Sequence, residues 1–286
     1  MSLLVACIAA AVVAHPGSGI VVDRNGTVYF LDTGSGVWKI DPGGKLTHFA
    51  DPRFHWMAID ENAQPFSAPL PSPRGGEITA IGSKPTILVS SDVPLAVGSD
   101  GAIYFPELGA DNRLRIVRFS RTGERSIHAV LPSSGLRWIN GLASAADGSL
   151  YYTEDRAVRK TDARGVVTTV VDAISIRDCA QIPGTDSGSQ PYLRGLAVAR
   201  DGALVVAASG CGAVLKITPR AEITTILRTA SPWSPTAVAD SPNGLYVLEY
   251  LHMEAEDRQA WVPRVRKVLP DGHVVDVAAV DRSKTR

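Results

Sequence analysis

The feature that most constrains the fold is a unit of four short apolar runs that recurs along the chain. Its clearest copy spans residues 18–50, SGIVVDRNGTVYFLDTGSGVWKIDPGGKLTHFA. The runs are rich in β-branched and aromatic residues, and DRNG supplies the turn residues of a tight hairpin. Each unit therefore predicts a four-stranded antiparallel meander. Because one meander is too small to bury its own faces, the copies must pack against one another.

A glycine at the end of the first hairpin fixes the alignment of the copies. It stands at Gly26, Gly101, Gly148, Gly202 and Gly244. Aligned on it, the first strands begin near Ser18, His55, Val93, Asn140, Arg194 and Thr236. These starts lie 37 to 54 residues apart, which is the repeat length of propeller blades. We therefore predict an all-β fold, a six-bladed β-propeller of four-stranded antiparallel blades that forms one domain over residues 15–286.

The second copy matches the unit least well, because it is degenerate around residues 61–63. In this copy we expect residues 66–70 and 77–82 to form the middle strands. The segment TILVSS, residues 86–91, is then expected as the last, outermost strand.

Net charge and the N-terminal segment indicate the partners and the cellular compartment to expect. The chain has 29 basic and 29 acidic residues, and this balance does not indicate a nucleic acid partner. Residues 1–14, MSLLVACIAAAVVA, are too short to span a bilayer as a helix. They resemble the apolar core of a secretory signal, and the alternative is a buried N-terminal strand or helix. We expect an exported, periplasmic or secreted protein without a membrane span.

Two phrases, NGLASAADGSLYYTED and GLAVARDGALVVAASGCGAVLKITP, are similar to NHL-repeat propellers and to the related senescence-marker/gluconolactonase family. The resemblance implies the propeller fold. Gluconolactonase relatives hold a divalent cation, usually calcium, with carboxylate and Asn oxygens at channel positions. Asn140 matches one such ligand, with Asp92 and Glu154 as candidates to complete the set. Arg194 stands where the family has an Asp, and its fixed positive charge opposes a metal. Alternatively, the Asn140 side chain holds the entry turn of its strand.

One face of the propeller is the expected binding site. Strands of a meander alternate in direction, so the starts of the first strands and the long insertions at 172–193 and 250–263 share that face. The candidate ligand-binding residues at this channel mouth are His55, Asn140, Arg194, Thr236 and Glu154. Arg194 either pairs with Glu154 or Glu249, or, together with His55, binds an anionic ligand.

Two residue pairs add further hypotheses. Glu249 and His252 are the candidate catalytic acid and base, and LYYTE resembles a signature of streptogramin-type lyases. Alternatively, His252 is an exposed loop residue. Cys179 and Cys211 fall on the same face of the same blade, so in an exported protein we expect a disulfide between them. The alternative is two separate buried thiols.

The preferred function is that of a binding propeller, which takes a small polar or anionic ligand or a protein partner at the channel mouth. The alternative is a divalent-metal-dependent hydrolase of lactones or esters, in which the metal polarises the carbonyl and activates water. A lyase is the third hypothesis.

Overall fold

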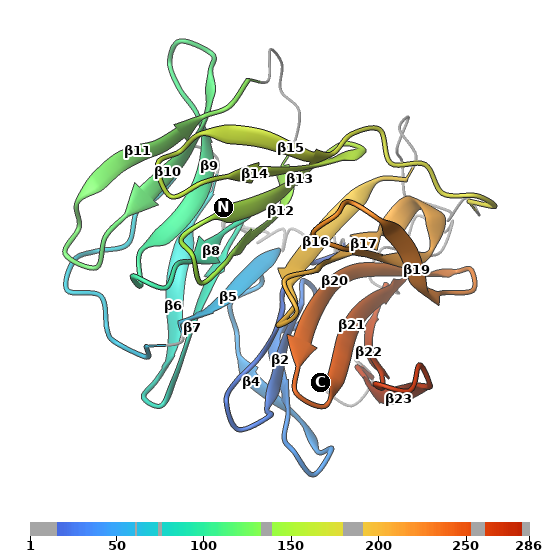
Figure 1. The fold of residues 1–286 in the computed structure, drawn as a ribbon. Helices are drawn as coiled ribbons and strands as arrows, with labels where there is room; N and C mark the ends of the chain where they lie inside the picture. Colours follow the sequence, from blue (N-terminus) through green and yellow to red (C-terminus); the bar gives the residue numbers. More distant parts are fainter. Residues whose placement is uncertain are drawn as a thin grey trace, which may run out of the picture.

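The computed structural model describes residues 16–60, 62–73, 76–132, 139–179, 191–252 and 261–281. These residues form six antiparallel sheets arranged as the blades of a six-bladed β-propeller (Figure 1). The predicted fold is thus confirmed, and the inner strand of each blade begins within three residues of the expected position. The expected signal segment, residues 1–14, lies outside the described residues.

Five blades contain four consecutive strands in simple spatial order. Blade one consists of β1 (Ile20–Val22), β2 (Val28–Asp32), β3 (Gly36–Ile40) and β4 (Leu46–Ala50). Blade three consists of β8 (Ala96–Val97), β9 (Ile103–Leu108), β10 (Leu114–Phe119) and β11 (Arg125–Val130). Blade four consists of β12 (Ile139–Ser144), β13 (Leu150–Glu154), β14 (Ala157–Thr161) and β15 (Val167–Val171). Blade five consists of β16 (Leu193–Val198), β17 (Leu204–Ala208), the 3₁₀ turn η1 (Ser209–Cys211), β18 (Ala213–Ile217) and β19 (Ile223–Arg228). Blade six consists of β20 (Trp233–Ser241), β21 (Gly244–Leu251), β22 (Pro263–Val268) and β23 (Val274–Ala279).

Blade two departs from the expected arrangement. It has three described strands, β5 (Trp56–Asp60), β6 (Ile78–Ser83) and β7 (Thr86–Ser91), in the spatial order β5-β7-β6. The expectation that residues 86–91 form the outermost strand and 66–70 a middle strand was therefore wrong. β7 is almost entirely buried whereas β6 has exposed residues, so the more apolar strand takes the middle place.

The segment expected as a middle strand packs on blade three instead. The Ser67 N–H donates to the Arg121 carbonyl at 3.0 Å, and the Arg121 guanidinium lies over the Phe66 ring, 5.2 Å from its centroid. Since this segment contacts the turn between β10 and β11, its backbone pairs with a neighbouring blade rather than with its own sheet.

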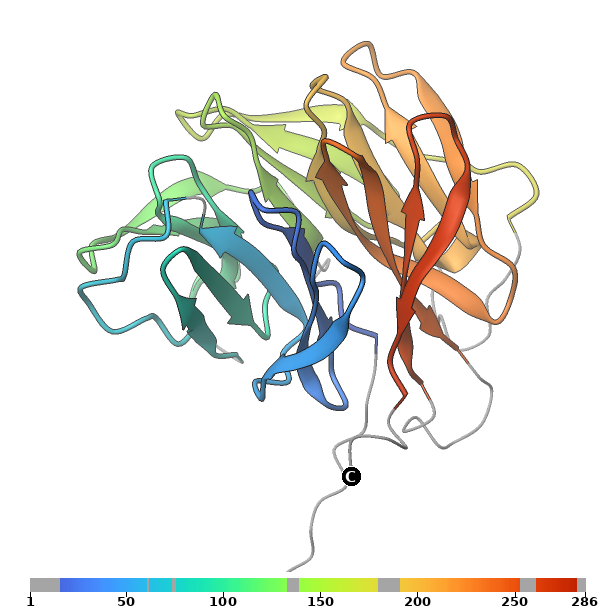
Figure 2. The same cartoon turned by 90° about the horizontal axis from the view of Figure 1, so that it is seen from below.

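The ring closes through side chains, because each blade is built from its own consecutive strands. Blade one and blade six lie side by side in both views (Figures 1 and 2). They share an apolar core that includes Ile20, Phe30 and Tyr250. The buried Tyr250 hydroxyl donates to the Leu31 carbonyl at 2.8 Å, so one side chain of blade six is hydrogen-bonded directly to blade one.

Glycines allow neighbouring inner strands to approach closely. A Cβ atom at Gly141 would lie 2.5 Å from the Arg194 carbonyl oxygen, and one at Gly195 would lie 2.9 Å from the Ala237 Cα. Since real Cβ atoms do not approach other atoms so closely, these positions exclude larger residues. The glycines at positions 141 and 195 thus allow the inner strands of blades four, five and six to lie close together.

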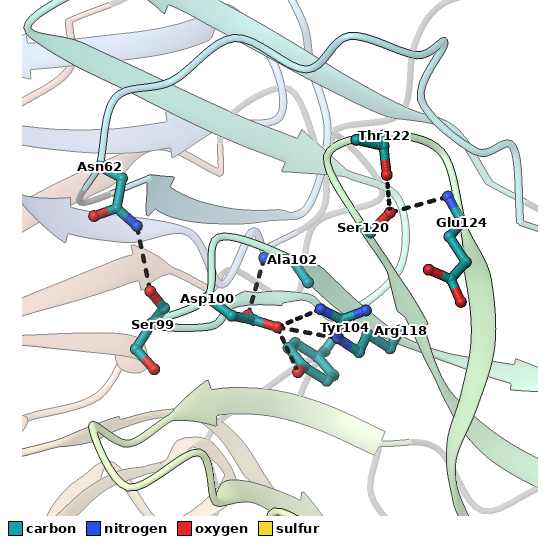
Figure 3. A network of polar contacts seen from close by, with 9 residues as sticks. All are labelled: Asn62, Ser99, Asp100, Ala102, Tyr104, Arg118, Ser120, Thr122 and Glu124. Carbon is teal, nitrogen blue, oxygen red and sulfur yellow. Dashed lines mark hydrogen bonds and ion pairs between the residues drawn. The ribbon is translucent and has the colours of Figure 1, made fainter.

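A basic residue recurs on the third strand of the blades, and in three of them it pairs with an Asp of the first hairpin turn. Arg118 donates to Asp100 at 2.6 Å, and Lys216 donates to Asp201 at 2.6 Å. Lys160 lies 3.7 Å from Asp147. Figure 3 shows the first of these pairs in its network. The repeated charge therefore holds the turns in place.

Candidate functional site

The expected site lies at the upper mouth of the channel, which we define as the end where the inner strands begin. Two side chains cross this mouth. Trp56 Nε1 of blade two donates to the Asn140 carbonyl of blade four at 3.0 Å. Arg194 of blade five reaches blade one, where Nε donates to Ser18 Oγ at 3.0 Å and Nη2 donates to the Pro16 carbonyl at 2.7 Å. Each contact joins blades that are two places apart in the ring.

The charge of Arg194 has no described counter-charge. Both of its acceptors are neutral oxygens, and burial lowers its pKa. The expected pairing of Arg194 with Glu154 or Glu249 was wrong. Glu154 accepts from Arg159 Nε at 2.6 Å, and Glu249 accepts from Arg264 Nε at 2.6 Å. Within the described part of the chain, no carboxylate lies within ion-pair distance of Arg194.

A buried histidine lies near Arg194. The His252 side chain is 2% exposed, and neither ring nitrogen has a hydrogen-bond partner among the described residues. Its ring packs on the Trp261 ring with centroids 4.9 Å apart. Burial first, and then the positive charge of Arg194, lower the pKa of His252 to about 3. The imidazole is therefore neutral at physiological pH, and one ring nitrogen can accept a hydrogen bond while the other donates.

The structure does not bring the candidate acid and base together. The fully buried Glu249 accepts hydrogen bonds from Thr229 Oγ1 at 2.7 Å and from Arg264 and Arg266. His252 follows three residues later, near the channel side chain of Arg194. Glu249 lies within β21, whereas His252 follows the end of that strand. Their described neighbours also differ, since His252 packs on Trp261.

The other expected ligand-binding residues differ in burial and in their contacts. His55 Nδ1 lies 3.4 Å from Asp92 Oδ1, and both side chains are half-buried. The fully buried Thr236 donates through Oγ1 to the Leu248 carbonyl within its own blade. Asn140 contributes its carbonyl to the Trp56 contact. Of these three, His55 is the one that carries an ionisable group at the mouth.

The expected metal ligands do not fit a divalent cation as they are arranged. Asp92 contacts His55, and Glu154 is bonded to the guanidinium of Arg159. In the described residues, no group of three or more His, Cys, Asp or Glu side chains could hold a metal ion. A hard cation requires several oxygen ligands around one point, and Asn140 with Asp92 and Glu154 does not supply them here.

The predicted disulfide between Cys179 and Cys211 is confirmed. It ties the chain that enters blade five to η1, at the end of β17. Arg228 reinforces this attachment, since Nη2 donates to the Arg177 carbonyl at 2.9 Å. The start of the insertion is therefore held against the blade. Disulfides are typical of oxidising compartments outside the cytosol.

Trp56 was not among the predicted site residues, although the sequence carries a signal for it. The residue after the strand start is glycine in three other copies, at positions 19, 141 and 195, and tryptophan in the second copy. A glycine at this position allows two neighbouring inner strands to approach, and an indole does not fit between them. The replacement of this glycine by tryptophan in the second copy therefore indicated that the Trp56 side chain points into the channel.

The comparisons with known proteins show the fold. No family model matches the chain, and no curated relative was found. Regucalcin of Agrobacterium tumefaciens strain C58, a calcium-binding protein, is 16% identical with a TM-score of 0.52, and the match covers 86% of this chain and 85% of that one. A putative gluconolactonase is 15% identical with a TM-score of 0.52 over 91% and 90%. Virginiamycin B lyase from Staphylococcus aureus is 17% identical with a TM-score of 0.50 over 91% and 83%.

At these identities the likeness extends to the propeller architecture alone. The neighbours include gluconolactonase-like proteins and a lyase, so the fold by itself does not choose between a binding and a catalytic function. The assignment to NHL repeats stays a prediction. Among the described residues, no helix is long and apolar enough to cross a membrane.

Proposed function

We propose that this protein is an exported propeller that binds a small polar anion, a carboxylate above all, at the upper mouth. One observation carries the proposal: Arg194 holds its positive charge inside the mouth against acceptors that bear no charge. A charge removed from water is costly unless it is paired. A bound carboxylate would supply the missing negative charge and accept the remaining N–H donors of the guanidinium.

His252 adds a second contact for the same ligand. Its buried imidazole is neutral and has two ring nitrogens without hydrogen-bond partners among the described residues. A hydroxyl or a carboxylic acid beside the carboxylate would satisfy them. A hydroxy acid therefore suits the pair of Arg194 and His252 better than a bare anion does. The same chemistry suits the C-terminal carboxylate of a protein partner.

Export is the part of the proposal that rests on other features. The disulfide between Cys179 and Cys211 supports an oxidising compartment. Residues 1–14 support it through their resemblance to a signal segment.

The alternative is a divalent-metal-dependent hydrolase of lactones or esters. Its support is the fold shared with the calcium-binding regucalcin and the putative gluconolactonase. The guanidinium of Arg194 opposes a cation at the same mouth, and the candidate ligands Asn140, Asp92 and Glu154 do not converge. A lyase would need an acid and base that act together, whereas Glu249 is bonded to Arg264 and Arg266.

Isothermal titration with acetate, lactate and citrate, and with glycerol as the uncharged control, tests the proposal. We expect at least one carboxylate to bind and glycerol not to bind. The Arg194→Gln variant should lose this binding, whereas Arg164→Gln, which alters an exposed turn arginine, should retain it. Equal binding by both variants contradicts the proposal. If peptides bind only with a free C-terminal carboxylate and small acids do not, the ligand is a protein partner.

Thermal unfolding with calcium, and then with excess chelator, tests the alternative. A ligand that binds only the folded state raises the midpoint of unfolding. We expect no shift. A rise of several degrees that the chelator reverses would favour the metal-dependent hydrolase and would count against a purely anionic site.

A further inference from the structure

A cavity lined by the six inner strands lies at the other end of the channel. We define this lower mouth as the end where the inner strands finish and the first hairpin turns begin. The cavity has a volume of about 470 Å³. It opens to solvent between the exposed residues Asn62, Ser99 and Ala146. At this rim Asn62 Nδ2 donates to the Ser99 carbonyl at 3.3 Å (Figure 3).

The cavity narrows inward and is blocked at the upper mouth. Toward the upper end, a separate cavity of about 40 Å³ lies between Ser18, Trp56 and Leu95. Beyond it, Trp56 and Arg194 cross the channel through their bonds to neighbouring blades. The lower cavity is therefore a blind funnel that is open to one side only. A ligand that enters it does not reach Arg194.

Strand edges form the walls of the funnel, and they present both peptide groups and aliphatic side chains. In blade three the Gly98 N–H donates outward to the Ala102 carbonyl at 2.9 Å. Since backbone direction alternates along a strand, the peptide groups of Val97 face the channel. The Val97 carbonyl accepts a hydrogen bond from Ser144 Oγ at 2.7 Å. Inward peptide groups of this kind suit a ligand that both donates and accepts hydrogen bonds.

Asp240 is the one ionisable side chain among the described lining residues. Its carboxylate is 25% exposed and lies 3.8 Å from Nε of Arg200, which is itself 56% exposed. Oδ2 also accepts from the Arg200 backbone N–H at 3.2 Å. Oδ1 has no partner in the described part of the chain. The ionisable group that lines the lower funnel is therefore a carboxylate 3.8 Å from an exposed guanidinium, whereas Arg194 at the upper mouth has no described counter-charge.

We propose that the lower funnel binds a small organic cation, a primary amine on a compact apolar body. The body fills the space between the aliphatic walls formed by Met57, Leu95 and Leu142. The ammonium group lies at the rim, where it donates to Oδ1 of Asp240 and to inward strand carbonyls. The volume is within the range of small-molecule sites and too small for a folded element of a partner.

Matched probes test the charge preference. Cyclohexylamine, cyclohexanol and cyclohexanecarboxylate have the same ring and differ in their polar group. We expect the amine to bind by isothermal titration, the alcohol to bind about tenfold more weakly, and the carboxylate not to bind at this end. If no probe binds, or if the alcohol binds as well as the amine, the proposal is overturned.

Three variants locate the binding. Asp240→Asn should weaken amine binding about tenfold and bring it level with the alcohol. Asp271→Asn alters an exposed turn aspartate of the same blade and should leave the amine affinity unchanged. Ala146→Trp places an indole at the exposed rim, where folding does not depend on it, and should abolish binding of both amine and alcohol.

The same titrations separate this site from the upper mouth. Arg194→Gln should leave amine binding unchanged, so failure of the carboxylate proposal does not affect this one. Unchanged amine binding by Ala146→Trp would place the amine elsewhere and overturn the proposal. Binding of a lysine-containing peptide without binding of the free amine would also overturn it, because the occupant would then be a protein.

Discussion

The two mouths of the channel are made by the same six inner strands, yet they differ in closure and in charge. At the upper mouth, Trp56 and Arg194 cross the channel, and Arg194 brings a buried positive charge without a described counter-charge. At the lower mouth, the short turns that contain Gly98 and Ala146 border a cavity of about 470 Å³, and the ionisable group that lines it is Asp240, 3.8 Å from Arg200.

The large side chains that cross the upper mouth stand at the starts of inner strands, Trp56 in β5 and Arg194 in β16. At the lower mouth, tight Asp-Gly or Asn-Gly turns close the first hairpins of five blades. The two features of a binding site therefore lie at opposite ends of the channel. The cavity of about 470 Å³ is at the lower mouth. The buried polar groups without described partners of opposite charge or hydrogen-bond partners, Arg194 and His252, are at the upper mouth.

Removal of the disulfide should have the largest effect on the free energy of unfolding, and it should leave binding at the lower funnel unchanged. A Cys179→Ala, Cys211→Ala double variant should lose about 3 kcal/mol of unfolding free energy, because the unfolded chain regains the entropy of the closed loop. Urea unfolding measures this loss. Amine binding at the lower funnel should persist under conditions where the variant is folded. An unfolding free energy equal to that of the unaltered protein would show that the disulfide does not hold the insertion.

Acid should destabilise the protein through His252. The folded protein holds this imidazole neutral with a pKa of about 3, whereas the unfolded chain binds the proton near pH 6.5. As the pH falls, His252 therefore binds a proton in the unfolded chain before it does so in the folded protein. The contribution of neutral His252 to the free energy of unfolding is complete above pH 6.5 and is lost as the pH falls toward 3. Between pH 6 and pH 4.5 the loss should be about 2 kcal/mol.

The difference between two variants isolates this contribution. His252→Phe keeps a ring against Trp261 and should flatten the dependence of the melting temperature on pH below 6.5. His273→Gln, at an exposed turn, should retain the slope of the unaltered protein. Identical slopes in all three proteins would show that His252 is solvated and not held in an apolar niche.

Arg194→Lys tests whether the upper mouth needs a guanidinium or only a positive charge. Lysine keeps the charge but cannot form the same paired contacts to Ser18 Oγ and the Pro16 carbonyl while also binding a carboxylate. Carboxylate affinity should fall about tenfold, equal to about 1.4 kcal/mol. Isothermal titration measures the change. An affinity equal to that of the unaltered protein would show that the carboxylate needs a positive charge at position 194 and not a guanidinium.

Trp56→Phe should have the smallest effect on stability and should bear most directly on the separation of the two mouths. The variant loses the hydrogen bond to the Asn140 carbonyl, at about 1 kcal/mol. Phenylalanine is also smaller than the indole, so the constriction between the mouths widens. We expect longer amines to bind this variant better than the unaltered protein. An unchanged length preference would mean that Trp56 does not end the funnel.

The repeat of the sequence determined the blades, because strand pattern and turn residues are local properties. The positions of the inner strands and the disulfide of Cys179 with Cys211 both follow from that register. The repeated basic residue was visible as a pattern, and its partner in the turn, such as Asp100 for Arg118, became clear from the structure.

The tertiary structure alone decided which residues meet across the ring. Arg194 bonds to Pro16, 178 residues away, and this contact depends on how six blades close. The place of β7 in the middle of blade two depends on burial against its neighbours, which the degenerate second copy does not encode locally. The open lower funnel also has no sequence signature, since its walls are strand edges whose peptide groups are the same for every residue type.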